Sequence, residues 1–331
     1  MPPSNKGLAP ILDVRGMTKH FPAGILFNKK QVHAVENATF TVQYSQVVAL
    51  VGESGSGKTT TIRMIARLIP VTQGEIFFEG ANIFKTEPRG ASMDYRSKVQ
   101  LIFQDPFASL NAVQTIEHHL ARPLIIHKKA FGRQEIHERV CDLLDTVELK
   151  PASEIANRYP HQLSGGQRQR VSIARALAVD PKLILADEPI SMLDVSIRMG
   201  VLNLIDKLKE ERGISYVYIT HDLASARYIG DQIMVMYAGH MVEGGDGEAI
   251  MREAAHPYTQ LLLSAVPNPQ AGLHTDKGIR VRGEVPSLID PPPGCPFGAR
   301  CPSVINICHQ IMPAKKELTP NHWVRCHLYS S

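Results

Sequence analysis

Apolar and polar residues alternate along residues 11–50, in stretches such as ILDVRGMTKHF and VHAVENATFTV. A period of two is typical of strands that bury one face. We therefore expect antiparallel strands here, with FPAGILFNKKQ as a hairpin insertion between them. A further strand pair is expected in GEIFFEGANIF.

The pattern becomes helical between about residues 106 and 180, which predicts a helical subdomain. Within it, RQEIHERVCDLLDTVEL has one apolar face. Cys141 lies on that face, so we interpret it as a core thiol rather than a metal ligand.

Strands are predicted again at 183–186 and 215–220, with the helical stretch IRMGVLNLIDKLKEE between them. The stretch QIMVMYAGHMVEGG predicts two final strands, joined at Ala238 and Gly239. The order strand, helix, strand is typical of a parallel sheet with crossover helices. The chain therefore has the pattern of an α/β protein with a parallel-sheet core.

The composition agrees with a folded cytosolic protein. Of 331 residues, 44% are apolar, and 36 Lys and Arg balance 32 Asp and Glu without a basic block that would suggest nucleic-acid binding. No secretory signal is visible, and the longest apolar runs fall far short of the ~20 residues that span a membrane. We expect any membrane contact to come through partner proteins.

A glycine-rich loop joins the apolar run VVALV to the helical stretch TTIRMIARLI. Its segment GESGSGKT matches the phosphate-loop pattern, in which backbone N–H groups surround phosphate oxygens at a helix N-terminus. We expect Lys58 to reach the β- and γ-phosphates and the Thr59 hydroxyl to bind Mg²⁺. The candidate nucleotide-binding residues of this loop are Gly52, Ser54, Gly55, Gly57, Lys58, Thr59 and Thr60.

An acidic pair, Asp187 and Glu188, ends the apolar run LILA. A carboxylate at a strand tip beside a phosphate loop suits Mg²⁺ through its water shell, which is the role we expect of Asp187. Glu188 is positioned in sequence to polarise the attacking water as a general base.

A second anion site is indicated by Ser164, Gly165 and Gly166, which precede the helical run QRQRVSIARAL. They place a hydroxyl and free backbone N–H groups at another helix N-terminus. Two such helix ends in one chain indicate either two ligands or one ligand that is held from two sides.

The segment LSGGQ, residues 163–167, is identical to the signature of the ATP-binding cassette (ABC) family, and the other motifs of that family occur in order. The chain therefore resembles an ABC ATPase. By this resemblance Gln104 would sense Mg²⁺ and the γ-phosphate, and Asp194 would lie in the loop that crosses between subunits. His221 would contact the γ-phosphate as the switch histidine.

The resemblance has further implications for the nucleotide site. Phe21 looks like the aromatic residue that stacks on adenine, with Phe27 and Tyr44 as rivals. Ser164 to Gln167 would hold ATP that is bound to the phosphate loop of a second cassette, because cassettes of this family pair head to tail. ATP binding closes such a dimer, and hydrolysis reopens it.

The resemblance covers nearly the whole chain and implies its organisation. Residues 1–255 would form the nucleotide-binding domain, with a phosphate-loop (RecA-like) core, an antiparallel β subdomain and a helical subdomain. Residues 256–331 would form a C-terminal extension. The chain has one set of nucleotide motifs, so the partner cassette must be another chain, a paralogue by resemblance, or a second copy.

Two C-terminal stretches, HPYTQLLLSAVPNP and VPSLIDPPPGCPFGARCP, resemble the oligopeptide and dipeptide importer branch. This branch implies two permease subunits, an extracellular substrate-binding protein and a peripheral location on the cytoplasmic side of the membrane. Some members carry oligosaccharides or nickel instead, and the sequence leaves those cargoes open. A soluble ABC ATPase acting on DNA or ribosomes is a remote alternative, because such proteins usually have a long coiled coil or tandem cassettes. A small-molecule kinase would leave LSGGQ unexplained.

The spacing of four cysteines is Cys295-x5-Cys301-x6-Cys308-x17-Cys326. In a reducing compartment clustered cysteines are more often metal ligands than disulfides. Four thiolates can hold Zn²⁺ or a [4Fe–4S] cluster, and disulfides or unligated thiols also remain open. The resemblance to the peptide-importer branch favours [4Fe–4S] in a small Cys-rich domain. We interpret His309, His322 and His327 as surface or supporting residues.

Overall fold

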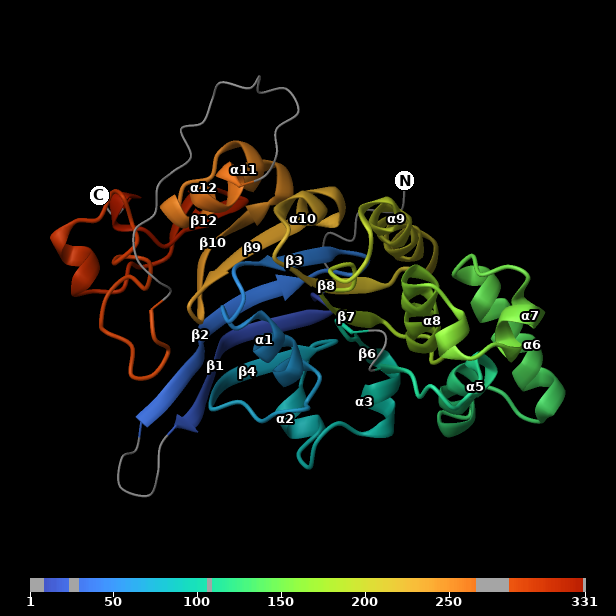
Figure 1. Ribbon diagram of the computed structural model, residues 1–331. Coiled ribbons are helices and arrows are strands. Elements are labelled where there is room, and N and C mark those ends of the chain that lie inside the picture. The colour runs from blue at the N-terminus through green and yellow to red at the C-terminus, as the bar shows by residue number, and fades with distance from the viewer. Residues whose placement is uncertain (1–8, 24–29, 106–108, 266–285, 330–331) are drawn as a thin grey trace. The chain divides into compact units, whose positions relative to one another are not determined.

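Figure 1 shows the computed structural model, which describes residues 9–23, 30–105, 109–265 and 286–329. The chain forms two compact units. The first unit joins residues 1–43, 47–86 and 218–331, and the second contains residues 44–46 and 87–217. The predicted division of the chain between residues 255 and 256 stays a prediction.

Antiparallel strands form one part of the first unit (Figure 1). β1 (Leu12–Ala23) pairs with β2 (Lys30–Val42) and with β4 (Gln73–Phe78), and the short β5 (Ala81–Asn82) adds to β4 before α2 (Ile83–Thr86) begins. Buried and exposed residues alternate along the end of β2, as in a strand with one covered face. The predicted antiparallel strands are confirmed. The predicted insertion falls largely on residues 24–29, outside the described residues.

A mixed sheet forms the core of the first unit. All of β3 (Val47–Val51) is buried, and it pairs in parallel with β9 (Gln232–Tyr237). β9 pairs antiparallel with β10 (His240–Asp246), which meets β2. α1 (Lys58–Ile65) follows β3, and α10 (Leu223–Ile229) follows β8 (Ser215–Thr220), the strand at which the two units divide. The chain thus has the expected α/β fold, and its sheet contains antiparallel as well as parallel pairs.

The prediction that β9 and β10 are the final strands is wrong. β12 (His322–Val324) pairs with β10 and with β11 (Lys316–Thr319). This pairing depends on the two glycines of β10, because a Cβ on Gly244 would lie 2.8 Å from the Trp323 ring and one on Gly245 would lie 2.4 Å from a backbone oxygen. The other C-terminal elements are α11 (Gly247–Arg252), α12 (Pro257–Ser264) and the 3₁₀ turns η2 (Asn306–His309) and η3 (His327–Tyr329).

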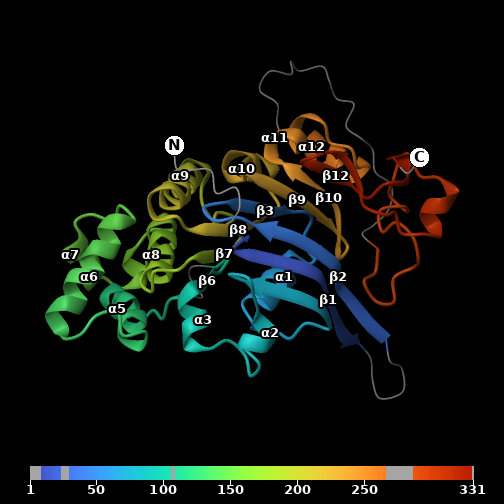
Figure 2. The same ribbon diagram turned by 180° about the vertical axis from the view of Figure 1, so that it is seen from behind.

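The second unit is mainly helical and contains the parallel pair β6 (Val99–Ile102) and β7 (Leu183–Asp187). Figure 2 shows its helices, and the helical subdomain predicted from the sequence pattern corresponds to α5 to α8. The helices and the 3₁₀ turn are α3 (Met93–Lys98), α5 (Ile116–Ile126), α6 (Arg133–Thr146), α7 (Ala152–Asn157), η1 (Pro160–Gln162), α8 (Gly165–Leu177) and α9 (Val195–Arg212).

Cys141 lies on α6 beside the core rather than within it. Its thiol is half-buried and lies 3.8 Å from Nε2 of His137. Burial raises the pKa of the Cys141 thiol, so a protonated thiol is expected here. Among the described residues, no helix is both long enough and apolar enough to cross a lipid bilayer.

Candidate nucleotide site

The phosphate loop leaves the end of β3 and enters α1 at Lys58. Two of its glycines are required by close backbone approaches. A Cβ on Gly52 would lie 2.1 Å from the carbonyl oxygen of Met236, and one on Gly57 would lie 2.4 Å from that of Ala34. Gly57 also has a φ of 103°, which side chains rarely permit. The loop can therefore follow this path only with glycine at both positions.

The side chain of Lys58 lies inside the loop and is buried. Its ammonium donates to the carbonyl oxygens of Gly52, at 2.7 Å, and Glu53, at 2.9 Å. The loop therefore surrounds a fixed positive charge at the N-terminus of α1. This arrangement can attract and hold phosphate oxygens. Thr59 and Thr60 follow in the first turn of the helix.

An ion pair that sequence reasoning missed supports this loop from the C-terminal region. Arg300, between Cys295 and Cys301, donates from its two terminal nitrogens to the two carboxylate oxygens of Glu53, at 2.8 and 3.2 Å. This hydrogen bonding raises the pKa of Arg300, so the guanidinium stays charged. Because 247 residues separate the partners in sequence, no local pattern indicates the pair.

Aromatic side chains surround the same contact. The fully buried Phe297 packs against the rings of Tyr237 and Tyr258, at centroid distances of 5.2 and 5.4 Å. The Tyr258 hydroxyl accepts a 2.8 Å hydrogen bond from the backbone N–H of Glu53. Burial raises the pKa of both tyrosines, so both hydroxyls remain neutral. The segment between Cys295 and Cys301 is therefore packed directly against the base of the phosphate loop.

His221 and Phe21 also belong to the first unit. His221 is exposed just after β8, next to Asp222, whose carboxylate caps α10. Phe21 lies in β1, and the Lys19 ammonium lies 4.7 Å from the centroid of its ring. The adenine-stacking role of Phe21 stays a prediction. Its rival Phe27 lies outside the described residues.

The acidic pair at the end of β7 belongs to the second unit. Asp187 is buried at the strand tip, and Glu188 follows with a φ of 45°, a strained value for a residue with a side chain. The N–H and hydroxyl of Ser191 both donate to the Glu188 carbonyl, at 3.2 and 3.0 Å, which holds this turn. Gln104 donates to the Glu188 carboxylate at 3.2 Å, so the fold brings these two predicted residues together.

The LSGGQ segment starts α8 with a capping box. The Ser164 hydroxyl accepts from the N–H of Gln167 at 3.3 Å, and the Gln167 side chain accepts from the N–H of Ser164 at 3.0 Å. After Gly165, Gly166 is buried against α9, where a Cβ would lie 2.4 Å from the Ile197 side chain. These contacts give the helix end a fixed, glycine-dependent shape.

Asp194 begins α9 as its N-cap residue. The three residues predicted to hold Mg²⁺ divide between the units, with Thr59 in the first and Gln104 and Asp187 in the second. Their joint binding of Mg²⁺ therefore stays a prediction.

The four C-terminal cysteines belong to the first unit, and no disulfide joins any of them within the part of the chain that the structure describes. Burial, and to a smaller degree the charges of Cys308, Cys326 and Cys301, raises the pKa of Cys295 to about 12. Within the described ranges, no three of the four cysteine sulfurs all lie within 4.8 Å of one another.

Two families match this chain. The family described as ABC transporter matches residues 35–191, and the oligopeptide/dipeptide transporter C-terminal region matches residues 242–308. The latter match covers three of the four cysteines discussed above.

Similar proteins cover nearly the whole chain. The oligopeptide transport ATP-binding protein AppF of Bacillus subtilis is 43% identical over 324 residues, with 97% of this chain and 98% of the relative covered. The dipeptide transport ATP-binding protein DppF of Haemophilus influenzae is 40% identical over 319 residues, with 96% of each covered.

The chain also resembles a solved structure of an ATP-binding cassette that forms a dimer. The dimeric ATP-binding cassette MJ0796, in a post-hydrolysis state bound to ADP and Pi, is 31% identical with a TM-score of 0.62, and the match covers 71% of this chain and 98% of that one. Together with the phosphate loop and the Gln104–Glu188 pair, these likenesses show that the chain is an ABC transporter ATPase and belongs to the oligopeptide/dipeptide importer family.

Proposed function

We propose that this chain hydrolyses ATP to power the uptake of oligopeptides or dipeptides through two partner permease subunits. An extracellular substrate-binding protein would deliver the cargo, and the chain would work at the cytoplasmic face of the membrane. The observation that carries the ATPase part is the glycine-rich loop closed around Lys58. Peptide cargo is supported by the names of the relatives. Oligosaccharide or nickel uptake is the alternative.

The chemistry follows from the positions of the charged side chains. Lys58 and the N-terminus of α1 would bind phosphate oxygens and stabilise the charge that builds up on the γ-phosphoryl group and on the departing ADP. Glu188 would accept a proton from the attacking water, and its hydrogen bond from Gln104 would orient it. His221 would contact the γ-phosphate.

Mg²⁺ would neutralise charge on the phosphates, held by Thr59, Gln104 and Asp187. The donor set fits, because a hydroxyl, an amide oxygen and a carboxylate are the oxygen ligands that Mg²⁺ prefers. Asp187 is buried at its strand tip, which keeps its carboxylate in a fixed place.

We propose head-to-tail pairing with a second ATPase subunit, as in the dimeric relative. The segment from Ser164 to Gln167 would then contact ATP on the phosphate loop of the partner, and Asp194 would lie in the loop between subunits. The fixed shape of the LSGGQ helix end supports this role, since a preformed N-terminus suits an anion.

We propose that the four cysteines hold a [4Fe–4S] cluster rather than a single zinc ion, as the resemblance to the peptide-importer branch implies. Four thiolate sulfurs that each lie ~2.3 Å from one Zn²⁺ lie about 3.8 Å from one another. In the described part of the chain, no three of the cysteine sulfurs all lie within 4.8 Å of one another. A cluster of several metal and sulfide atoms holds its thiolates further apart. Its contribution would be structural, as a cross-link that fixes the small Cys-rich region beside Glu53 and Tyr258.

Transport is tested in vesicles that contain this ATPase, its partner ATPase and both permeases. ATPase activity should rise with a peptide-loaded binding protein, and Glu188→Gln should bind ATP while turnover falls at least ~100-fold. Wild-type turnover in Glu188→Gln would contradict the assignment of the base. Stimulation by a sugar-loaded or nickel-loaded binding protein, and not by the peptide-loaded one, would contradict the cargo.

A further inference from the structure

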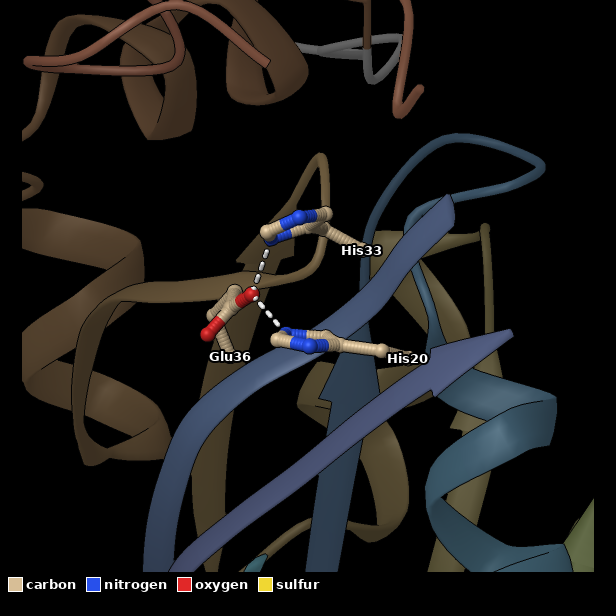
Figure 3. Close-up of side chains that lie close together, drawn as sticks. All are labelled: His20, His33 and Glu36. Carbon is tan, nitrogen blue, oxygen red and sulfur yellow. Dashed lines mark hydrogen bonds and ion pairs between the residues drawn. The ribbon is translucent and has the colours of Figure 1, made fainter. Parts of the chain in front are cut away.

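Two histidines and a glutamate from β1 and β2 gather on one side of the sheet (Figure 3). His20 and His33 are paired across the two strands, and Glu36 follows on β2. Nε2 of His20 and Nδ1 of His33 each lie 2.5 Å from the same Glu36 carboxylate oxygen. The three side chains therefore direct one donor atom each to a common point.

This cluster lines a pocket of about 560 Å³. Its side chains are 20–27% exposed, so an ion can reach them from solvent. His240, opposite Glu36 on β10, lines the same pocket. On the other side the pocket is closed by residues 286–288 and 291–296, and the backbone N–H of His33 donates to the Leu288 carbonyl at 2.8 Å.

Phe21 follows His20 directly in β1. Because neighbouring side chains of a strand lie on opposite faces, the histidine cluster and the predicted adenine-stacking residue occupy different faces of the sheet. If Phe21 stacks on adenine as predicted, the cluster lies on the opposite face of the sheet from that contact. What the cluster can bind depends on its own three side chains and not on the proposed function.

We propose that His20, His33 and Glu36 form a binding site for a divalent transition metal of the zinc class. Two imidazole nitrogens and one carboxylate oxygen are a known Zn²⁺ donor set that leaves one coordination position open. Nitrogen donors disfavour Mg²⁺ and Ca²⁺, which take oxygen ligands. His240 lines the pocket from the adjacent strand and is the candidate for the fourth position.

The Glu36 carboxylate requires only a small movement to accommodate a metal. All three donor atoms lie within 4.8 Å of one another. Ligands at ~2.0–2.1 Å in a tetrahedral site lie roughly 3.3 Å apart, so the carboxylate must move away from the rings by less than about 1 Å. Rotation of the Glu36 side chain supplies such a movement. The bound ion would cross-link β1 to β2 beside the hairpin.

The test uses Co²⁺ as a spectroscopic probe on the full-length protein, after its iron content has been measured. Cys295 and Cys308 line the same pocket, so the readout must separate nitrogen and oxygen ligands from thiolates. A histidine and carboxylate site gives weak visible ligand-field bands. Thiolate ligation adds an intense near-ultraviolet charge-transfer band. We expect the ligand-field bands alone, with Zn²⁺ displacing Co²⁺ at one equivalent.

His33→Gln should weaken Co²⁺ binding at least ~10-fold, while the matched variant His118→Gln, on α5, should bind as the wild type does. Circular dichroism of the metal-free proteins establishes that both variants are folded. Binding that His33→Gln leaves unchanged, binding with only the thiolate charge-transfer band, or no binding would each overturn the proposal.

Discussion

Replacing Arg300 by glutamine should weaken ATP binding although Arg300 is far from the phosphate loop in sequence. The guanidinium neutralises the carboxylate of Glu53, the second residue of that loop, through two hydrogen bonds of 2.8 and 3.2 Å. Without the guanidinium, a negative charge would remain close to the place where the phosphates bind. Glu53 would also be free to leave its position against Tyr258.

The magnitude follows from the exposure of the pair. The Arg300 and Glu53 side chains are 12% and 31% exposed. Exposed pairs contribute about 0.2–1 kcal/mol, and breaking fully buried ones costs about 3–5 kcal/mol. After allowance for solvent screening at Glu53, we expect a coupling of about 1–2 kcal/mol in the free energy of unfolding. We expect about 1 kcal/mol in ATP binding, which is roughly a fivefold rise in Kd.

The assay is a double-mutant cycle of Arg300→Gln and Glu53→Gln, with ATP affinity and urea unfolding measured for all four proteins. The double variant should recover most of the ATP affinity that Arg300→Gln loses. The control is a second cycle on Arg252 and Glu248, a pair of similar length at 2.8 Å whose side chains are 74% and 72% exposed. Its coupling should stay below about 0.5 kcal/mol. Additive effects at Arg300 and Glu53, within about 0.5 kcal/mol, would refute the reasoning.

Three further outcomes are expected. Gly166→Ala should lower stability by about 1–3 kcal/mol in urea unfolding, because the new methyl group meets Ile197. Gly165→Ala is the comparison, and equal effects would contradict this explanation. Burial lowers the pKa of His256 from 6.5 to about 4, so the folded protein favours the neutral ring. The contribution of this neutral ring to the free energy of unfolding is fully present above pH 6.5 and is lost as the pH falls toward 4. His256→Asn keeps a helix-capping acceptor and should flatten the fall in stability between pH 6.5 and 4, and an unchanged slope would count against His256. Anaerobically purified protein should be brown and contain iron and sulfide, whereas colourless protein with stoichiometric zinc would rule out the cluster.

The phosphate loop is predictable from sequence because its determinants are local. Glycines at fixed spacing, a lysine and a threonine define it, and the strand before it and the helix after it are equally clear. The Gln104–Glu188 contact, at 3.2 Å, joins residues 84 positions apart. Glu188 is indicated by its place after an apolar strand, whereas only the family resemblance drew attention to Gln104.

Long-range contacts made by ordinary residues could not be predicted in this way. Arg300 is one of 36 basic residues, and its partner is selected by packing around Phe297 rather than by any pattern near it. β12 is three residues long and lies in a region without alternation. The histidine cluster likewise depends on the pairing of His20 with His33, beside an irregularity in the β1–β2 register.

The discontinuous first unit has a consequence for how the protein is made. The second unit is almost one continuous segment, so most of its contacts become available when residue 217 has been synthesised. The first unit needs residues 218–331 as well, including β12, Arg300 and all four clustered cysteines. Until the ribosome releases these residues, β2 lacks its neighbour β10 and β3 lacks its neighbour β9, and such unpaired strand edges are prone to aggregate. The phosphate loop therefore receives its supporting contact from Arg300 only after that residue has been synthesised, long after the loop itself.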